Sequence, residues 1–175
     1  MTTLETDRLI LREVTQDDHA GIAEMLGDPG VEEYDTPLAR GPGAPQIWID
    51  RQRERYARHG LGLWAVERRA EPGFIGLIGI INHEIPEVSD LEIGWHLKRA
   101  HWGNGYAREG AIACRDHGFG KLGRDRMISL IRPANAASIR VAQSIGMRLE
   151  RTIFIQKFGR DTAVFAVDRP PALGH

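Results

Sequence analysis

The stretch from Leu91 to Gly110, which reads LEIGWHLKRAHWGNGYAREG, constrains the fold more than any other part of the chain. Its first half has the period-two alternation of a strand, with apolar residues at Leu91, Ile93, Trp95 and Leu97. Gly103 and Gly105 interrupt this pattern, and a helix is expected from about Tyr106. The chain must therefore pass from a strand into a helix through a short glycine turn.

Such a turn is suited to binding phosphate. The first N–H groups of a helix have no acceptor within the helix, and the helix dipole favours negative charge there. Glycine permits the left-handed backbone angles that direct successive N–H groups into one concavity. Basic residues gather around the turn, namely Lys98, Arg99, His101 and Arg108. The pattern predicts a phosphate-rich ligand, and a tight turn without a ligand is the alternative.

Two common phosphate motifs are excluded. The dinucleotide-binding fingerprint needs a third glycine where this chain has Arg108. The P-loop needs Ser or Thr after Gly-Lys, whereas Gly120 and Lys121 are followed by Leu122.

The composition is that of an ordinary globular protein. A length of 175 residues suits a single domain over residues 1–175, with its core at about 4–167. A formal net charge of −1 argues against a general nucleic-acid or membrane-surface binder. The single cysteine, Cys114, excludes an intramolecular disulfide. No signal-peptide core or membrane-spanning run is recognisable, so a cytoplasmic protein is expected.

Strands and helices are expected to alternate along the chain. The expected strands are Leu4 to Glu13, Gly62 to Arg68, Phe74 to Asn82, Ser89 to Leu97 and Asp125 to Ile131, followed by a hairpin of Met147 to Lys157 and Thr162 to Val167 around residues 159–161. The mixed order predicts α/β layers around a central sheet in a single domain.

Four helices are expected. The first follows Thr15 and has Ile22, Met25 and Leu26 on its apolar face, and the others are Gln46 to Arg58, with Ile47 and Ile49 among the residues setting its faces, Tyr106 to Phe119, and Asn135 to Gly146. The proline-rich stretch from Asp28 to Pro45 is expected to be mostly loop, with a short turn near Val31 to Tyr34.

Several motifs resemble one known family. The string WGNGYA at residues 102–107 resembles the pyrophosphate loop of the GCN5-related N-acetyltransferase (GNAT) superfamily, written Gln/Arg-x-x-Gly-x-Gly/Ala. EIGW at residues 92–95 extends the resemblance to the RimJ/RimL-like branch, which acetylates ribosomal-protein N-termini. TDRLILR at 6–12 is similar to the first strand of that branch, and NAASIR at 135–140 to its Asn-x-x-Ser helix. Trp102 stands where the family in general has Gln or Arg, and a tryptophan is familiar there in this branch.

The resemblance covers roughly Leu4 to Val167 and implies a fold and a cofactor. The implied fold is a GNAT-type α/β domain whose central mixed, mostly antiparallel sheet splays between the fourth and fifth strands, flanked by about four helices. The implied cofactor is acetyl-CoA (coenzyme A), which enters the gap between those strands. The residues expected to bind it are Ile93, Trp95 and Leu97 through the main chain, the loop residues Trp102, Gly103, Asn104, Gly105, Tyr106, Ala107 and Arg108, and Asn135 beside the pantetheine arm.

Glu92 is the candidate general base. Transfer to an amine needs an uncharged amine, donors for the tetrahedral oxyanion and a proton for the leaving thiolate, but no nucleophilic side chain. Glu92 lies on the strand before the glycine turn and shares a face with Gly94 and His96. The resemblance matches a glutamate here, acting directly or through water. The alternative is an exposed strand glutamate in a salt bridge.

Ser138 is the candidate acid. The resemblance implies that its hydroxyl lies near the cofactor sulfur; many relatives use a tyrosine, but no tyrosine follows Tyr106 in this chain. Asn135 and Ser138 are three residues apart and share one face at a helix start. Plain helix capping is the alternative for Asn135.

Other chemically capable residues are interpreted structurally. His83, His96 and His101 lack metal-ligand spacing, so no metal site is expected. Cys114 is expected to be a small core residue, and Trp48, Trp64 and Trp95 are expected to pack rather than to cage a substrate. The acidic residues Asp28, Glu32, Glu33 and Asp35 either attract a cationic amine or form a solvated loop.

The sequence therefore predicts an acetyl-CoA-dependent N-acetyltransferase in which the amine attacks the thioester directly. The acceptor is left open between a protein or peptide N-terminal α-amine and a small amine such as a polyamine, an amino acid or an antibiotic. A non-catalytic acyl-CoA-binding regulatory protein and a nucleotide-binding module are the competing hypotheses. No nucleic acid or membrane partner is expected, and the protein is expected to be a monomer or a homodimer.

Overall fold

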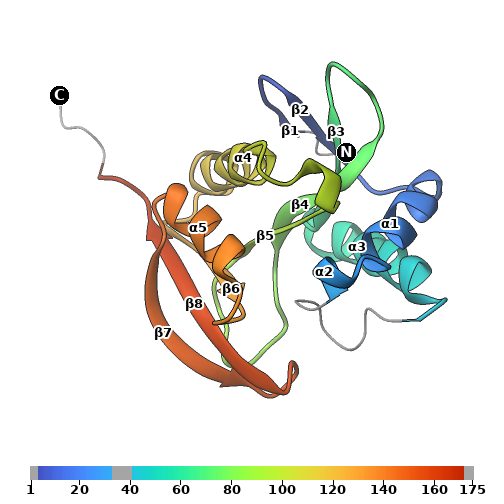
Figure 1. The fold of residues 1–175 in the computed structure, drawn as a ribbon. Coiled ribbons are helices and arrows are strands. Elements are labelled where there is room, and N and C mark those ends of the chain that lie inside the picture. Colours follow the sequence, from blue (N-terminus) through green and yellow to red (C-terminus); the bar gives the residue numbers. More distant parts are fainter. Residues whose placement is uncertain (1–3, 33–40, 172–175) are drawn as a thin grey trace.

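A mixed β-sheet forms the centre of the molecule (Figure 1). The computed structural model describes residues 4–32 and 41–171, without the side chains of 31 and 32. Within these ranges the sheet has eight strands in the order β1-β2-β3-β4-β5-β6-β8-β7. Their bounds are β1 Leu4–Glu5, β2 Leu9–Arg12, β3 Leu63–Arg68, β4 Phe74–Ile81, β5 Glu92–Leu97, β6 Arg126–Ile131, β7 Arg148–Ile155 and β8 Arg160–Asp168.

The neighbouring strands β5 and β6 are the parallel pair, whereas the other neighbours in this described sheet run antiparallel. Their ladder has a single paired position, Glu92 with Ile128, and the strands then diverge. By contrast, β4 and β5 stay in register from Gly76–Leu97 to Ile81–Glu92. The expected splay between these strands, the fourth and fifth of the sequence prediction, is confirmed.

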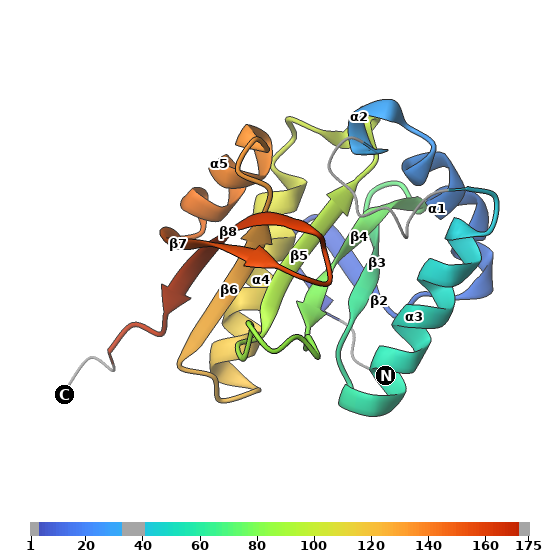
Figure 2. The same cartoon turned by 90° about the horizontal axis from the view of Figure 1, so that it is seen from below.

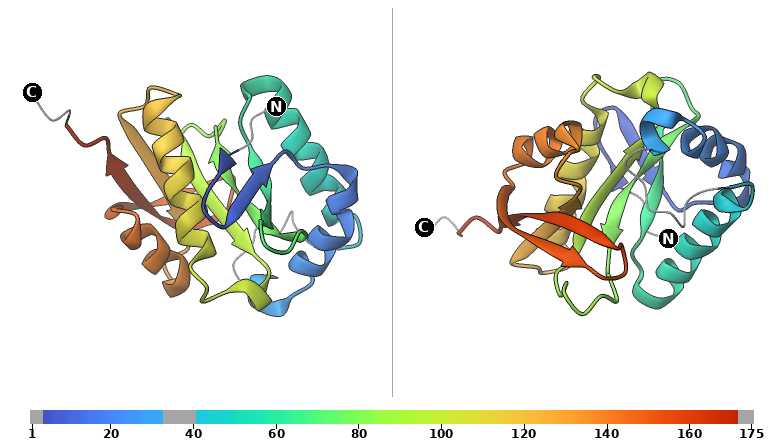
Figure 3. Two further views of the ribbon diagram at one scale, coloured as in Figure 1. Left: turned by 90° about the horizontal axis from the view of Figure 1, so that it is seen from above. Right: turned by 60° about the horizontal axis from the view of Figure 1, so that its bottom comes forward.

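Helices cover both faces of the sheet. On one side lie α4 (Tyr106–Gly120) and α5 (Ala136–Ser144), and on the other α1 (His19–Leu26), α2 (Pro29–Glu32) and α3 (Ala44–His59) (Figures 1 and 3). The β7–β8 hairpin crosses in front of β5 and β6 in the view of Figure 2. No helix in residues 4–32 or 41–171 is long and apolar enough to cross a membrane.

Each helical layer has its own apolar core. Trp64, Ile78, Ile93 and Met127 are fully buried in the core that includes α4, and Cys114 of α4 lies among them. Gly110 lets α4 approach β4, because a Cβ at this position would lie 2.6 Å from the Ile78 side chain. The second core joins α1 and α3 to the sheet through Ile22, Met25, Trp48, Ile49 and Leu77.

The α/β class, the mixed and mostly antiparallel sheet and the expected helices are confirmed, but three local predictions were wrong. The strand expected over Leu4 to Glu13 is two short strands, because Thr6 turns the chain and its Oγ1 accepts a hydrogen bond from Leu9 N at 2.9 Å. Ile47 is 47% exposed and does not set the buried face of α3; Trp48 and Ile49 do. The turn expected near Val31 begins earlier, as α2, and residues 33–40 lie outside the described chain.

A buried ion-pair network fixes α1 to the sheet. Asp18, which is 3% exposed, accepts hydrogen bonds from Arg12 at 2.9 and 2.8 Å and from Thr15 N at 2.8 Å. Glu67 of β3 also pairs with Arg12, at 2.6 Å. Hydrogen bonds to Asp18 raise the pKa of Arg12 above its usual range, and those to Glu67 add to this effect against the opposing cost of burial. The arginine therefore stays charged.

Replacing Asp18 tests this network. Asp18→Ala leaves a partly buried guanidinium and a free N–H group, so the free energy of unfolding should fall by about 3 kcal/mol. Urea unfolding at pH 7 measures the loss. Asp17→Ala is the matched control, since Asp17 is an exposed carboxylate in the same turn. Equal stability of the two variants would contradict the assignment.

Candidate active site

A cavity of about 1160 Å³ lies where β5 and β6 part. It is lined by both strands, by α3, by the start of α4, by α5 and by the turn of the β7–β8 hairpin. The sequence-predicted residues that line it are Glu92, Ile93, Trp95, Leu97, Trp102, Gly103, Gly105, Tyr106, Ala107, Arg108, Asn135 and Ser138. Asn104 is the predicted residue that does not, because its amide turns back to the carbonyls of His101 and Trp102 at 3.2 and 3.1 Å.

The glycine loop leads directly into α4. Gly103 and Gly105 have φ of 75° and 78°, the left-handed region that glycine adopts without strain. Gly105 is the residue preceding the helix, which begins at Tyr106 as the sequence predicted. The loop is exposed, so the first N–H groups of α4 face open space at the end of the cavity.

The basic residues near the loop differ in whether an acidic side chain pairs with them. Lys98 pairs with Glu24 at 2.6 Å, and Arg99 pairs with Asp28. Burial first, and then the positive charges of Arg68 and Lys98, lower the pKa of His101. Arg108 has no acidic partner among the described residues and lines the cavity. Of these four basic residues, Arg108 is therefore the cation without an acidic partner in the described chain, and backbone N–H groups lie beside it.

Arg8, in the turn of the N-terminal hairpin, contacts the glycine loop. Its guanidinium lies 4.7 Å from the centre of the Tyr106 ring and donates to Asn104 O at 3.0 Å. It also pairs with Glu109 at 2.6 Å, and Glu109 accepts from Thr6 Oγ1 at 2.6 Å. Desolvation alone would raise the pKa of Glu109, but hydrogen bonds from Thr6 and Arg8 outweigh it and lower the pKa.

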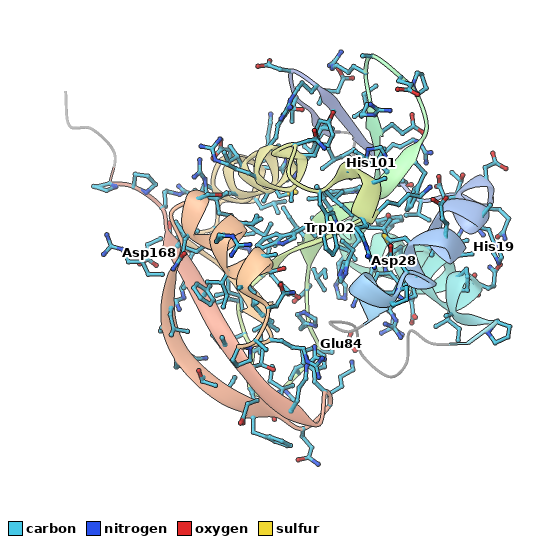
Figure 4. The ribbon with its side chains drawn as sticks, in the orientation of Figure 1. His19, Asp28, Glu84, His101, Trp102 and Asp168 are labelled. Carbon is cyan, nitrogen blue, oxygen red and sulfur yellow. The ribbon has the colours of Figure 1, made fainter. Side chains whose placement is uncertain are left out.

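Two backbone carbonyls of β5 that face the gap already accept hydrogen bonds from side chains. Ile93 O accepts from Ser129 Oγ at 2.7 Å, and Leu97 O accepts from Trp102 Nε1 at 2.8 Å. Trp95 lies between them, and the alternation of the strand directs its backbone N–H and C=O to the same side. Trp102, which is 44% exposed, thus closes the end of the strand with its indole N–H (Figure 4).

Glu92 occupies the point of divergence. Its Oε1 accepts from Leu130 N at 3.2 Å, and its Oε2 contacts His83 Nε2. The side chains of His83 and Glu92 are only 8% and 11% exposed. The alternative of an exposed salt-bridged strand glutamate is therefore wrong, and a buried carboxylate–imidazole pair takes its place.

This pair defines a tautomer. An ionised carboxylate can only accept, so its bond to the imidazole requires a proton on Nε2 of His83. In the neutral ring, Nδ1 then carries the lone pair and can accept a proton. The sequence analysis missed His83 as a site residue, because no local spacing links it to Glu92. The β4–β5 pairing could have indicated it, since Ile81 opposes Glu92 and His83 follows two residues later.

Ser138 and Asn135 lie on the other side of the gap. Asn135 Oδ1 caps α5 by accepting from Ser138 N at 3.0 Å, so the capping alternative holds for that oxygen. Ser138 Oγ accepts from Trp95 Nε1 at 3.3 Å. Because the indole supplies this proton, the hydroxyl hydrogen of Ser138 is left to donate elsewhere.

The structure also shows the surroundings of the tryptophans and of Cys114. Trp64 is a core residue, Trp48 is buried in the second core and also lines the cavity, and Trp95 is half-buried and lines the cavity. Cys114 is fully buried, and burial raises the pKa of its thiol. In the described chain, no group of three or more His, Cys, Asp or Glu side chains could hold a metal ion.

The acidic cluster is described only at Asp28, which pairs with Arg99 and accepts from Gly30 N at 2.8 Å. The Glu32 side chain, Glu33 and Asp35 lie outside the described part of the structure.

The chain is similar to one family model, to a curated relative and to solved structures. Residues 8–148 match the family model described as "Acetyltransferase (GNAT) domain". The chain is 38% identical over 165 residues to the uncharacterized protein YkkB of Bacillus subtilis, covering 94% of each chain. An acetyltransferase from Agrobacterium tumefaciens is 26% identical with a TM-score of 0.79, over 97% of this chain and 95% of that one. Mycobacterium smegmatis RimJ, solved with CoA-disulfide, is 21% identical with a TM-score of 0.77, over 99% and 88%.

Glu109 gives a prediction for stability. Its folded pKa is lower than the ordinary value, so its contribution is present above pH 4.5 and is lost as the pH falls through the folded pKa. Glu109→Gln should lower the free energy of unfolding by about 1 kcal/mol at pH 7, with a smaller difference at pH 3. Urea unfolding at both pH values measures this, with the exposed Asp116→Asn as control. A difference that grows on acidification would refute it.

Proposed function

The chain belongs to the GNAT family of acetyltransferases, and we propose that it transfers the acetyl group of acetyl-CoA directly to a primary amine. The observation that carries the proposal is one continuous cavity. It joins a glycine loop at a helix N-terminus to a buried carboxylate–imidazole pair across the parting of β5 and β6. A pyrophosphate at one end and an amine at the other would meet in this gap.

The cofactor is proposed to bind along the gap. The N–H groups of residues 103–108 and the Arg108 guanidinium hold the pyrophosphate, because they are the donors that the loop leaves without acceptors. The backbone of Trp95 pairs with the pantetheine amides, since the carbonyls of Ile93 and Leu97 already have donors. The side-chain amide N–H groups of Asn135 face the same arm, because its oxygen is used in capping.

The proton transfers are assigned to two groups. The amine must lose a proton to attack, and His83 Nδ1, held in place by Glu92, accepts it directly or through water. The amine nitrogen forms a bond to the acetyl carbon while the carbon–sulfur bond breaks. The leaving thiolate takes the hydroxyl proton of Ser138, and the serine oxygen is reprotonated by the second proton that the nitrogen loses as it becomes an amide. Glu92 thereby acts through His83, whose ring it orients by accepting the Nε2–H hydrogen bond, rather than as an isolated base.

The acceptor is proposed to carry an α-amine or a similar unhindered primary amine. A protein or peptide N-terminus is the first candidate, by analogy with the RimJ/RimL-like branch. A small amine-bearing molecule is the second. Thiol release from acetyl-CoA across a panel of peptides and small amines tests the activity itself. Binding of acetyl-CoA without release for any amine would favour a non-catalytic acyl-CoA-binding protein.

Variants of the carboxylate–imidazole pair test the proton assignment. Glu92→Gln and His83→Gln should each lower kcat at pH 7 by about 100-fold, because the amine loses its proton acceptor. Activity should recover partly at higher pH, where more free amine exists in solution. Glu84→Gln, which removes an exposed carboxylate from the edge of the same cavity, should retain normal turnover. Wild-type turnover in His83→Gln with intact folding would remove His83 from the mechanism.

A variant of the glycine loop tests the cofactor end. Gly105→Val forces a branched side chain into a left-handed backbone and should raise the KM for acetyl-CoA at least about tenfold. Gly123→Val is the matched control, since Gly123 has φ of 63°, open surroundings and no place in the cavity. Equal KM values for the two variants would oppose this placement.

A further inference from the structure

One face of α3 forms a wall of the cavity and carries mainly hydrogen-bond donors. Trp48, Arg51, Gln52 and Arg55 all line the cavity, and their spacing of three, four and seven residues places them on one stripe of the helix. We call these four residues the α3 wall. Trp48 Nε1 and Gln52 Nε2 are buried and have no acceptor within the described residues. The Gln52 oxygen is used by Leu63 N at 2.9 Å.

The two arginines of the α3 wall lack acidic partners in the part of the chain that the structure describes. Arg55 is half-buried and donates only to Gln52 Oε1, at 3.3 Å, among the described residues. Arg51 is half-buried and forms no ion pair with a described residue. Arg58 differs, since it pairs with Glu54 at 2.9 Å and with Glu84 at 3.3 Å. Arg58, which also lines the cavity, is thus neutralised by Glu54 and Glu84, whereas Arg51 and Arg55 have no acidic partner among the described residues.

Burial and the neighbouring positive charge make the charged state of Arg55 less favourable. Burial is the main influence that lowers the pKa of Arg55, and the positive charge of Arg51 lowers it further. The charge of Glu92 acts in the opposite direction, which places the α3 wall within electrostatic reach of the carboxylate–imidazole pair. Two like charges one helical turn apart destabilise a helix. A basic helix C-terminus explains Arg58 and His59, which lie in the last turn, but not Arg51.

We propose that the α3 wall binds the carboxylate of the acceptor, so that the substrate is a primary amine bearing a carboxylate, with Arg51 and Arg55 as its anion subsite. This inference rests on the proposed acetyl transfer at the same cavity. Guanidinium groups match carboxylates in planar, charge-assisted pairs, and a bound anion removes the repulsion between the arginines. Lys157, on the turn of the β7–β8 hairpin, adds a further cation to the cavity lining.

The subsite also accounts for discrimination between amines. Two cations beside the reaction centre disfavour an ammonium group, which lowers the pKa of a bound amine and helps it to become neutral. The same charges repel polyamines and aminoglycosides, which carry several positive charges and no carboxylate. The carboxylate source is a free amino acid or the acidic side chain of a short peptide.

Matched acceptors that differ only in one charge test the proposal. The free-acid arm compares glycine with glycinamide and β-alanine with β-alaninamide. The peptide arm compares Ser-Glu-amide with Ser-Gln-amide, and spermidine is included as a cationic amine. Steady-state kcat/KM is measured with saturating acetyl-CoA for the wild type, for the double variant Arg51→Gln/Arg55→Gln and for Arg53→Gln. Arg53 is exposed on the same helix, outside the cavity, and serves as control.

In at least one pair, the acid should exceed its amide by about tenfold or more in kcat/KM in the wild type. The double variant should lose that preference through a higher acceptor KM, with the amide and the KM for acetyl-CoA little changed. Arg53→Gln should match the wild type. The arm that shows the preference identifies the carboxylate source. Equal use of acids and amides, preferred use of spermidine, or a preference that survives in the double variant would overturn the subsite.

Calorimetry separates this inference from the proposed function. The same acids and amides are titrated into protein saturated with coenzyme A. Tighter binding of an acid than of its amide, lost in the double variant, supports the subsite even where no amine is acetylated. The absence of acetylation would then reject the proposed acetyl transfer but not the subsite. Acetylation of amines without any advantage for the acids in turnover or binding would reject the subsite and leave acetyl transfer standing.

Discussion

The parting of β5 and β6 is the constraint on which the rest of the structure depends. After their single ladder pair, both strands lose backbone partners, and buried peptide groups without hydrogen bonds are costly. Side chains replace the missing partners: Ser129 donates to Ile93 O, and Glu92 accepts from Leu130 N. The sheet can therefore open in its middle, and the opening becomes a cavity bounded by helices on both faces.

Glu92 consequently joins the fold to the proposed chemistry. One carboxylate oxygen holds the backbone of β6, and the other holds the imidazole of His83. A substitution at Glu92 thus acts on the sheet and on the proton acceptor together. His83 is the cleaner probe, since its ring contacts Glu92 and the edge of Phe158 and forms no hydrogen bond to a backbone group of the described residues. A kinetic change that substitutions at Glu92 and at His83 both produce would therefore reflect proton transfer rather than a disturbed sheet.

Charge is distributed unevenly along the cavity, although the whole chain has a formal charge of only −1. Near the glycine loop, Lys98 and Arg99 are paired with acids of the α1–α2 region, which leaves backbone N–H groups and Arg108. On the α3 wall, two arginines face the same space without acidic partners in the described chain. The glycine loop and the α3 wall of the same cavity therefore both favour anions. A substrate with an anion beside its amine would fit such a field.

The sequence by itself determined the features that depend on neighbouring residues. The strand, the glycine turn and the start of α4 at Tyr106 follow from local backbone preferences, and so does the Asn135 cap of α5. Only the tertiary structure decided the contacts between distant segments. Glu109 ties the turn at Thr6, the β4–β5 hairpin brings His83 to Glu92, and packing of α3 turns Arg51 and Arg55 inward while Ile47 stays exposed. Helical periodicity specifies which residues share a face, but packing specifies which face meets the cavity.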